Sequence, residues 1–248
     1  LLKNIRKSRL HDRPPFGVSA LLPPDDPHAV AQNQDISSDR IKRIRQAEAK
    51  SHIEAYMNHE LYSVGSWLSK PVKSVLDILP CFDEYKQLRV LDLGSGIGRN
   101  AVAIARYFRS IDCQIDCVDI LELAIEKLND NADKYGVVNA INGIVSSIDD
   151  YLIHTDSYDL VLAISALEHI NSVEAFADKL QEISLGLRRN GIACLIVNSG
   201  VQESSIETGE ERIPQFEVNI PTETMLNLLT KSFPGWEVLK QTVVHQTY

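Results

Sequence analysis

The stretch VLDLGSGIGRN, residues 90–100, decides the fold that this sequence predicts. It runs from an apolar, strand-like segment through three glycines into helix-like sequence. Such a turn brings free backbone N–H groups to the positive end of a helix, so a polar ligand can bind at the carboxyl edge of a sheet. The glycines are spaced GxGxG, whereas a dinucleotide fingerprint needs GxGxxG and a Walker loop needs Gly-Lys before Ser or Thr. The stretch therefore disfavours a nicotinamide dinucleotide or a phosphoryl-donating ATP as the ligand.

Strand-like and helix-like segments alternate after this turn. The predicted strands span residues 87–94, 113–120, 139–145, 158–165 and 192–199, and the longer helices span residues 98–108, 121–135 and 173–188. Such alternation, with apolar and β-branched strands, indicates a parallel sheet covered by helices on both faces. We therefore predict the α/β class, with a doubly wound, mostly parallel sheet. Residues 236–248 predict one or two further strands, which leaves open an incomplete last hairpin.

The N-terminal part of the chain differs in composition from the rest. Prolines and turn formers recur over residues 13–39, so we expect residues 1–38 to form an extended arm. Good helix formers follow, with apolar residues at nearly helical spacing, and they predict a helical cap over residues 39–80. Residues 81–248 are then the ligand-binding domain. Its polar connection, residues 201–214, is expected to lack strands, and Thr222 is a candidate N-cap of the next helix.

Charge and cysteine content narrow the classes of function. The 248-residue chain has a formal net charge of −9, which disfavours nucleic acid, although ten of the first fifty residues are Lys or Arg. We find no apolar run of the roughly 18 residues that a membrane span needs, and no pattern of a secretory signal. The four cysteines form no CxxC pair, which argues against a zinc site and favours a reducing compartment. We expect a cytoplasmic protein without a metal, in which Cys113 and Cys117 are core residues.

The glycine turn, preceded by an acidic residue two positions earlier, resembles the first motif of the class I S-adenosylmethionine-dependent methyltransferases. This motif runs through Asp92, Gly94, Ser95, Gly96 and Gly98. The resemblance implies a Rossmann-like methyltransferase fold with a seven-stranded type of sheet. It also implies that the glycine backbone approaches the amino-acid and ribose portions of the cofactor, while Asp92 helps to hold its ammonium group.

Further motifs of the same family follow in order, so that the resemblance spans about residues 88–198. Asp119 stands 25 residues after Gly94, where a carboxylate can accept hydrogen bonds from both ribose hydroxyls. Family resemblance further implies adenine contacts from Ile120, Ser147 and Ile148, although the family commonly has an acidic residue where Ser147 stands. Ala163 occupies the end of the fourth predicted strand that faces the methionine part of the cofactor. The implied cofactor is S-adenosylmethionine, with S-adenosylhomocysteine as its product.

Methyl transfer needs a positioned acceptor and a site without water, and it needs a base only when the acceptor holds its proton. His169 is the candidate base, and Glu168 could orient it or an acceptor amine; alternatively, both are ordinary residues of a helical segment that are solvated or bond the backbone. Tyr56 and Tyr62 are candidates for the acceptor pocket, with simple packing as the alternative. The sequence leaves the acceptor atom and the oligomeric state open.

The function that the sequence predicts is methyl transfer from S-adenosylmethionine to a small-molecule acceptor by in-line displacement. A non-catalytic methyltransferase-like binding module and a protein or RNA methyltransferase stay as alternatives. The stretch AISA, residues 163–166, stands where enzymes that methylate nucleic-acid amino groups carry an Asn/Asp-Pro-Pro-Tyr/Phe motif. Its presence disfavours nucleic-acid bases as acceptors.

Overall fold

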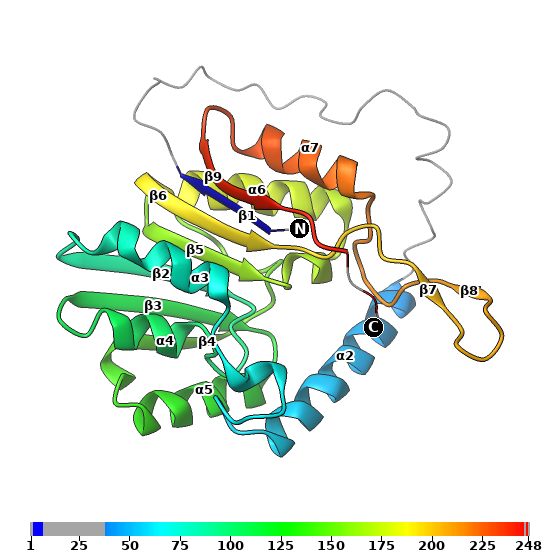
Figure 1. Ribbon diagram of the computed structural model, residues 1–248, viewed down its shortest axis with the longest axis horizontal. Helices are drawn as coiled ribbons and strands as arrows, with labels where there is room; N and C mark the ends of the chain where they lie inside the picture. The colour runs from blue at the N-terminus through cyan, green and yellow to red at the C-terminus, as the bar shows by residue number, and fades with distance from the viewer. Residues whose placement is uncertain (1, 7–37, 246, 248) are drawn as a thin grey trace.

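A computed structural model of the chain describes residues 2–6, 38–245 and 247, and Figure 1 shows how its elements are arranged. Its strands are β1 (Leu2–Arg6), β2 (Gln87–Leu93), β3 (Asp112–Asp119), β4 (Ile141–Val145), β5 (Tyr158–Ile164), β6 (Leu187–Ile196), β7 (Glu203–Ser204), β8 (Glu211–Arg212) and β9 (Glu237–Thr242). Its α-helices are α2 (Ser38–Asn58), α3 (Lys73–Ile78), α4 (Ala101–Tyr107), α5 (Glu122–Lys134), α6 (Val173–Gly186) and α7 (Thr222–Ser232). Short 3-10 helices are η1 (Trp67–Ser69), η2 (Leu79–Phe82), η3 (Val138–Ala140) and η4 (Leu167–His169).

Seven of the strands form one sheet in the order β4-β3-β2-β5-β6-β1-β9. Strands β2 to β6 pair in parallel, with β2 at the point where the strand order reverses. The carboxyl ends of β2, β3 and β5 therefore meet at one edge, where ligands bind in open α/β sheets. This arrangement confirms the predicted mostly parallel, seven-stranded, Rossmann-like sheet.

Side chains that alternate along each strand build two cores, one on each face of the sheet. Val90 and Cys117 pack with α3, α4 and α5 on one face, while Leu91 and Val161 pack with α6 and α7 on the other. Figure 1 shows these two helical layers on opposite sides of the strands. Both faces are covered, which explains why the strands read as nearly continuous apolar runs. Cys113 and Cys117 are buried core residues, as expected from the sequence.

The N-terminal segment differs from the expected arm at its beginning. Residues Leu2–Arg6 form β1, which pairs antiparallel with both β6 and β9. Of the one or two strands expected in residues 236–248, the described residues form one, β9, and its antiparallel neighbour β1 comes from the opposite end of the chain. Local periodicity identifies a strand but does not say which strand it pairs with. The rest of the predicted arm, residues 7–37, lies outside the described residues.

Three smaller expectations need correction. The first helix of the cap, expected to run from residue 39 to about residue 70, is α2, which ends at Asn58 before a stretch of turns that contains Gly65. The polar connection 201–214 contains a two-stranded ribbon, β7 paired with β8, which extends away from the sheet in Figure 1. The cap of α7 is Pro221, since the Thr222 hydroxyl instead pairs with the Ser199 hydroxyl at 3.0 Å.

Helix α2 lies beyond the carboxyl ends of the parallel strands, across the edge where the glycine turn emerges (Figure 1). Two arginines attach it to the loops there. Arg40 donates to the carbonyl oxygens of Pro214 and Phe216, and Arg45 reaches three loops that are described below. Among the described residues, no helix is both long and apolar enough to cross a bilayer.

Candidate functional site

The glycine turn is held tightly against β3. The backbone N–H groups of Gly94 and Ser95 both donate to the carbonyl oxygen of Val118, at 2.8 and 3.0 Å. All three motif glycines have positive φ, at 71°, 52° and 89° for Gly94, Gly96 and Gly98. A side chain is strained in this region, so the turn requires glycine on conformational grounds.

All three glycines also have close neighbours where a side chain would lie, and a Cβ atom on Gly98 would lie 2.5 Å from Cδ1 of Leu128 in α5. A Cβ atom on Gly94 would lie 2.6 Å from the Cβ of Ala166, and one on Gly96 would lie 2.8 Å from the hydroxyl oxygen of Tyr56. The turn is therefore enclosed by the loop after β5 on one side and by helix α2 on another.

Asp119 ends β3 and closes the turn from the other side. One carboxylate oxygen accepts from the N–H of Gly96 at 2.8 Å, and the other accepts from the N–H of Leu121 at 2.9 Å. Burial raises the pKa of Asp119, and the two backbone donors partly offset this by lowering it. Each oxygen has a further lone pair, so the carboxylate can still accept from a pair of neighbouring hydroxyls.

Asp92 and Ser95 leave buried polar atoms without partners beside the turn. Within the described residues, Asp92 Oδ2 and Ser95 Oγ have no hydrogen-bond partner. Burial, followed by the charge of Asp119, raises the pKa of Asp92 to about 7. A buried carboxylate without a partner is costly, and a cationic group on a ligand would relieve that cost. The turn thus suits a ligand with both a cation and a diol.

The three residues predicted to contact adenine differ from the glycine turn in their exposure and hydrogen-bond partners. Ile120 follows β3 with 52% of its surface exposed, as a stacking residue without its ligand would be. The Ser147 hydroxyl donates to the Asp150 carboxylate at 2.6 Å and accepts from the Asp150 N–H, so it closes a turn. Ile148 is partly buried against the α6 side of the sheet. All three residues follow the carboxyl ends of β3 or β4. The Ser147 hydroxyl, however, already has two local hydrogen-bond contacts, both to Asp150.

The position of Ala163 corrects one expectation. Its side chain is fully buried in the core with α6 and α7, on the opposite face from the residues that flank it in β5. Because side chains alternate along a strand, Ala163 could meet a ligand at this edge through its backbone at most. The residue that approaches the glycine turn is Ala166, three positions later, which the sequence did not single out.

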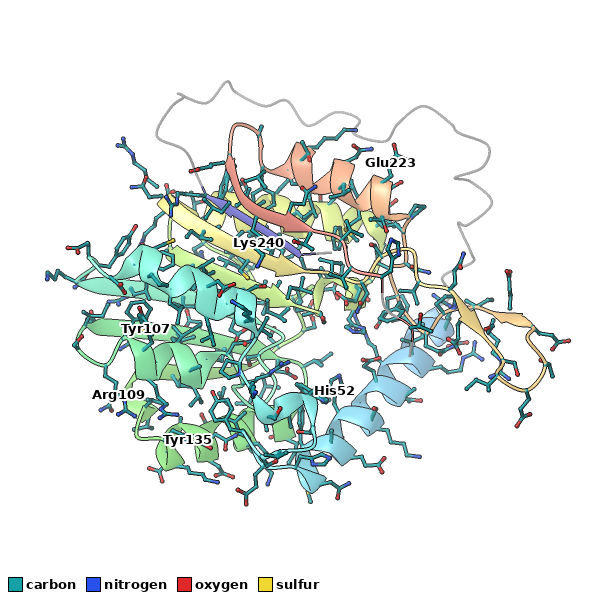
Figure 2. All side chains as sticks on the ribbon, viewed as in Figure 1. His52, Tyr107, Arg109, Tyr135, Glu223 and Lys240 are labelled. Atoms are coloured by element: carbon teal, nitrogen blue, oxygen red, sulfur yellow. The ribbon has the colours of Figure 1, made fainter. Side chains whose placement is uncertain are left out.

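The cap contributes an aromatic group over the turn. Tyr56 is 5% exposed, and its ring lies 5.6 Å from His52 and 6.1 Å from Trp67 between centroids. His52 is labelled in Figure 2, where it extends from α2. Burial, together with the charges of Asp119 and Glu48, raises the pKa of the Tyr56 hydroxyl, so this group stays protonated. Tyr56 is thus placed beside the turn, as expected for a residue of the ligand pocket.

Tyr62 has other partners. Its hydroxyl donates to the carbonyl oxygen of Arg99 at 2.9 Å, and its ring packs edge-on against Tyr135 at 5.4 Å. It also lines an open cavity against α4, together with Ser69, Pro71, Ala103, Arg106, Tyr107 and Arg109. The structure therefore gives Tyr62 a packing role on the α4 side and does not bring it together with His169.

Glu168 and His169 lie in η4, just after β5. Glu168 is fully buried; its Oε1 accepts from the backbone and side-chain amides of Asn198, while Oε2 has no partner among the described residues. Burial raises the pKa of Glu168. The expectation that Glu168 orients the His169 ring is not met, because Glu168 bonds to the end of β6.

A different carboxylate contacts the His169 ring. The Nδ1 atom lies 3.0 Å from Oε2 of Glu217, and Nε2 lies 3.6 Å from a carboxylate oxygen of Glu48 on α2. Burial lowers the pKa of His169, but the Glu217 hydrogen bond and the charges of Glu168, Glu48 and Glu217 outweigh it, and the pKa is raised overall.

Arg45 joins helix α2 to three loops at this edge. It donates to Asp149 at 3.0 Å and to the carbonyl oxygen of His169 at 3.1 Å, and its Nε lies 3.4 Å from Glu217. These loops follow β4, follow β5 and precede α7. One guanidinium, with its fork of donors, therefore holds the cap in place over the site.

Five further residues complete this edge, and the sequence analysis assigned none of them a role: Arg40, Arg45, Glu48, Ala166 and Glu217. Glu217 lies 48 positions from His169, and Arg45 lies 172 positions from Glu217. The one local signal was the polar connection before residue 214, whose length suits a segment that borders a site.

Comparisons with known proteins identify a similar family of domains. A family model described as a methyltransferase domain matches residues 90–191, from β2 into β6. None of the curated protein sequences that were compared matches the chain.

Solved structures show the same fold at low sequence identity. The phosphoethanolamine N-methyltransferase 1 of Haemonchus contortus is 17% identical with a TM-score of 0.54, over 77% of this chain and 40% of that one. A putative S-adenosylmethionine-dependent methyltransferase of Listeria monocytogenes is 19% identical with a TM-score of 0.51, over 64% and 78% of the two chains. The [4+2]-cyclase SpnF is 19% identical with a TM-score of 0.51, over 68% of this chain and 60% of that one. The chain thus spans well under two thirds of the enzyme from Haemonchus and about 60% of the cyclase.

The fold, the glycine turn and the carboxylates at its edge define a protein with a Rossmann-like sheet. The family match is more specific: residues 90–191 match the model of a methyltransferase domain, and S-adenosylmethionine is the cofactor that this match implies. The buried, unpartnered oxygen of Asp92 fits the cationic end of that cofactor, and Asp119 fits its ribose diol.

Proposed function

We propose that this protein transfers the methyl group of S-adenosylmethionine to a small-molecule acceptor. The observation that carries the proposal is the roof that α2 forms over the glycine turn, where Tyr56 packs on Gly96 and Arg45 attaches the helix to three loops. A roofed site suits a small acceptor, whereas a protein or RNA chain needs an open groove. The net charge of −9 also opposes a nucleic-acid substrate.

The residues around the turn have separate tasks in this proposal. Asp92 and Ser95 hold the amino-acid end of the cofactor, Asp119 accepts from its ribose hydroxyls, and Ile120 packs on its adenine. When bound, the cofactor supplies an electrophilic methyl carbon on a sulfonium. The protein then has to place the acceptor atom about 3 Å away and in line, and to keep water out. Helix α2 keeps water out, and Tyr56 on that helix lines the acceptor side.

His169 is the proposed base of the site. It lies after β5, next to Ala166, which touches the glycine turn. Its Nε2 atom faces α2 through Glu48, so it faces the space between the cap and the sheet edge. Phosphoethanolamine, named with the Haemonchus structure, is an example of a small acceptor that this fold can serve.

The proposal is tested with purified protein and S-adenosylmethionine labelled in its methyl group. The protein is incubated with a low-molecular-weight extract in one sample and with the matching protein and nucleic-acid fractions in others. We expect label to enter the low-molecular-weight fraction, dependent on the protein. Label in the macromolecular fractions would instead show a protein or RNA methyltransferase. Calorimetric binding of the cofactor without labelling of any fraction would favour a non-catalytic module.

A further inference from the structure

Two short segments that are far apart in the sequence pack together at the site. The segment Phe216-Glu217-Val218, before α7, lies on the pair Glu168-His169. The Phe216 ring stacks on His169 at 5.9 Å and 28°, and the Val218 N–H donates to the Glu168 carbonyl at 2.9 Å. Between them, Glu217 meets the His169 ring at 3.0 Å. This one segment therefore holds the plane of the His169 ring, the Glu168 carbonyl beside it and the Nδ1 atom of the ring.

The Glu217 contact determines which ring nitrogen carries the proton. The Glu217 side chain is wholly buried, and because a carboxylate only accepts hydrogen bonds, Nδ1 of His169 is the donor in this contact. In the neutral ring, the lone pair then belongs to Nε2. That tautomer is the one a base needs when its second nitrogen faces the substrate.

The charged groups around His169 come from every element that packs on it. Glu217 approaches Nδ1 from the loop before α7, and Glu48 approaches Nε2 from α2. Glu168 is adjacent in the chain, and Arg45 of α2 binds the His169 carbonyl oxygen. Of these, Glu217 meets Nδ1 with one oxygen and pairs with Arg45 through the other, so it leaves Nε2 for the acceptor.

We propose that Glu217 is the positioning residue of His169, and that the acceptor is a group that holds its proton at neutral pH, a hydroxyl, a phenol or an ammonium, and gives that proton up to Nε2. This inference rests on the proposed function. A buried carboxylate that fixes a histidine tautomer serves a reaction in which that histidine gains a proton. A thiol or a carboxyl group gives up its proton more readily and has less need of such a base.

The proposed step balances in atoms and charge. The acceptor oxygen or nitrogen forms a bond to the methyl carbon while the carbon–sulfur bond breaks and its electron pair stays on sulfur. The acceptor's proton passes to Nε2 of His169, and the imidazolium that forms lies beside the Glu217 carboxylate. The products are the methylated acceptor and S-adenosylhomocysteine, and solvent later removes the proton from His169.

The first test reads His169 directly and needs no acceptor. Protein labelled with ¹⁵N in its histidines is saturated with S-adenosylhomocysteine, and the ring nitrogens are followed by NMR as the pH changes. Glu217→Gln is compared with the wild type, Glu217→Asp keeps the charge, and His169→Gln assigns the signal. Glu223→Gln, an exposed glutamate of α7 labelled in Figure 2, is the matched control.

In the wild type we expect the neutral ring with its proton on Nδ1. In Glu217→Gln the pKa of His169 should fall by about one unit or more, with partial recovery in Glu217→Asp and no change in Glu223→Gln. An unchanged tautomer and pKa in a folded Glu217→Gln protein would overturn the positioning role. Circular dichroism establishes that each variant is folded.

The second test concerns the acceptor class. A panel of matched phenols, alcohols, primary amines, thiols and carboxylates is offered with the labelled cofactor. We expect label on the compounds that hold their proton at neutral pH, which are the phenols, alcohols and amines. In Glu217→Gln, kcat should fall at least tenfold with KM nearly unchanged, and the pH below which activity is lost should move down. Methylation of thiols or carboxylates in preference to these compounds would overturn the acceptor assignment. If the wild type labels nothing in any fraction, the proposed function itself fails, while the NMR result still decides the role of Glu217.

Discussion

The carboxylate of Asp119, at the end of β3, accepts a 2.8 Å hydrogen bond from the backbone N–H of Gly96 in the glycine turn. This bond fixes the turn relative to the second strand of the sheet before any ligand arrives. It also aims the carboxylate along the edge where the cofactor ribose is expected. One side chain therefore has a structural task and a binding task, and a substitution should reveal both.

Replacing Asp119 with Ala should weaken S-adenosylmethionine binding by ten- to a hundredfold, because hydrogen bonds to a charged acceptor contribute about 1.5–3 kcal/mol. It should also lower the melting temperature without cofactor, since the N–H groups of Gly96 and Leu121 lose their acceptor. Calorimetric titration and thermal melts measure the two effects. Asp130→Ala, on the exposed side of α5, is the control. Unchanged affinity in Asp119→Ala would contradict the ribose assignment.

Asp92 should make the protein's stability fall with rising pH. Its folded-state pKa of about 7 is above its ordinary value of 3.8, so the folded state binds this proton more tightly than the unfolded state does. Between about pH 4 and 7, the free energy of unfolding therefore decreases as pH rises, by about 1.4 kcal/mol for each unit of pKa shift at most. Thermal melts of wild type and Asp92→Asn over this range measure the effect.

Asp92→Asn should flatten that pH dependence. It should also weaken the binding of the cofactor, because the ionised carboxylate attracts the cofactor's cationic group. We expect the wild type to bind S-adenosylmethionine more tightly as pH rises toward 8, and the variant to bind weakly at every pH. A pH profile for cofactor affinity that is the same in both proteins would show that Asp92 does not contact the cationic end.

Gly96→Ala should destabilise the protein by about 1–3 kcal/mol, both through its φ of 52° and through the 2.8 Å approach to the Tyr56 hydroxyl. The double variant Tyr56→Phe with Gly96→Ala removes that oxygen and should recover part of the loss. Gly65→Ala serves as the control, because it has a positive φ but no atom within 4 Å of the added carbon. Denaturant unfolding of these variants and of Tyr56→Phe alone gives the free energies that the comparison needs. Strict additivity of the two substitutions would mean that Tyr56 does not pack on the turn.

Arg45→Ala should loosen helix α2, because this guanidinium links it to Asp149, Glu217 and the His169 carbonyl. Backbone amides of α2 are expected to exchange with deuterium faster, and S-adenosylhomocysteine to dissociate several-fold faster. Arg43→Ala is the control on the same helix, where Arg43 bonds within its own turn to Asp39. Equal exchange in the two variants would show that the cap is held by its apolar contacts instead.

Much of this protein could be predicted from its sequence because the signals are local. The glycine turn demands positive φ at Gly94, Gly96 and Gly98, and no other residue adopts those angles so readily. The alternation of strands and helices determines which faces are apolar, and hence a parallel sheet with two covered faces. The acidic ends of the first two strands, Asp92 and Asp119, then follow from where those strands stop.

The tertiary structure decided what depends on pairs that are distant along the chain. The pairing of β1 with both β6 and β9 joins opposite ends of the sequence, and a strand's own pattern carries no record of its neighbour. Local alternation could not show that Ala166, rather than Ala163, approaches the turn, since the chain bends after β5.

The same limit applied to the candidate base. The sequence placed Glu168 beside His169 because they are adjacent in the chain, yet adjacent residues there point in different directions and Glu217 meets the ring. By itself, the sequence determined the sheet, the glycine turn and the carboxylates that follow from local backbone geometry and burial. Folding alone decided the cap's attachment through Arg45 and the pairing of His169 with Glu217, because those contacts exist only where separate loops meet at one edge of the sheet.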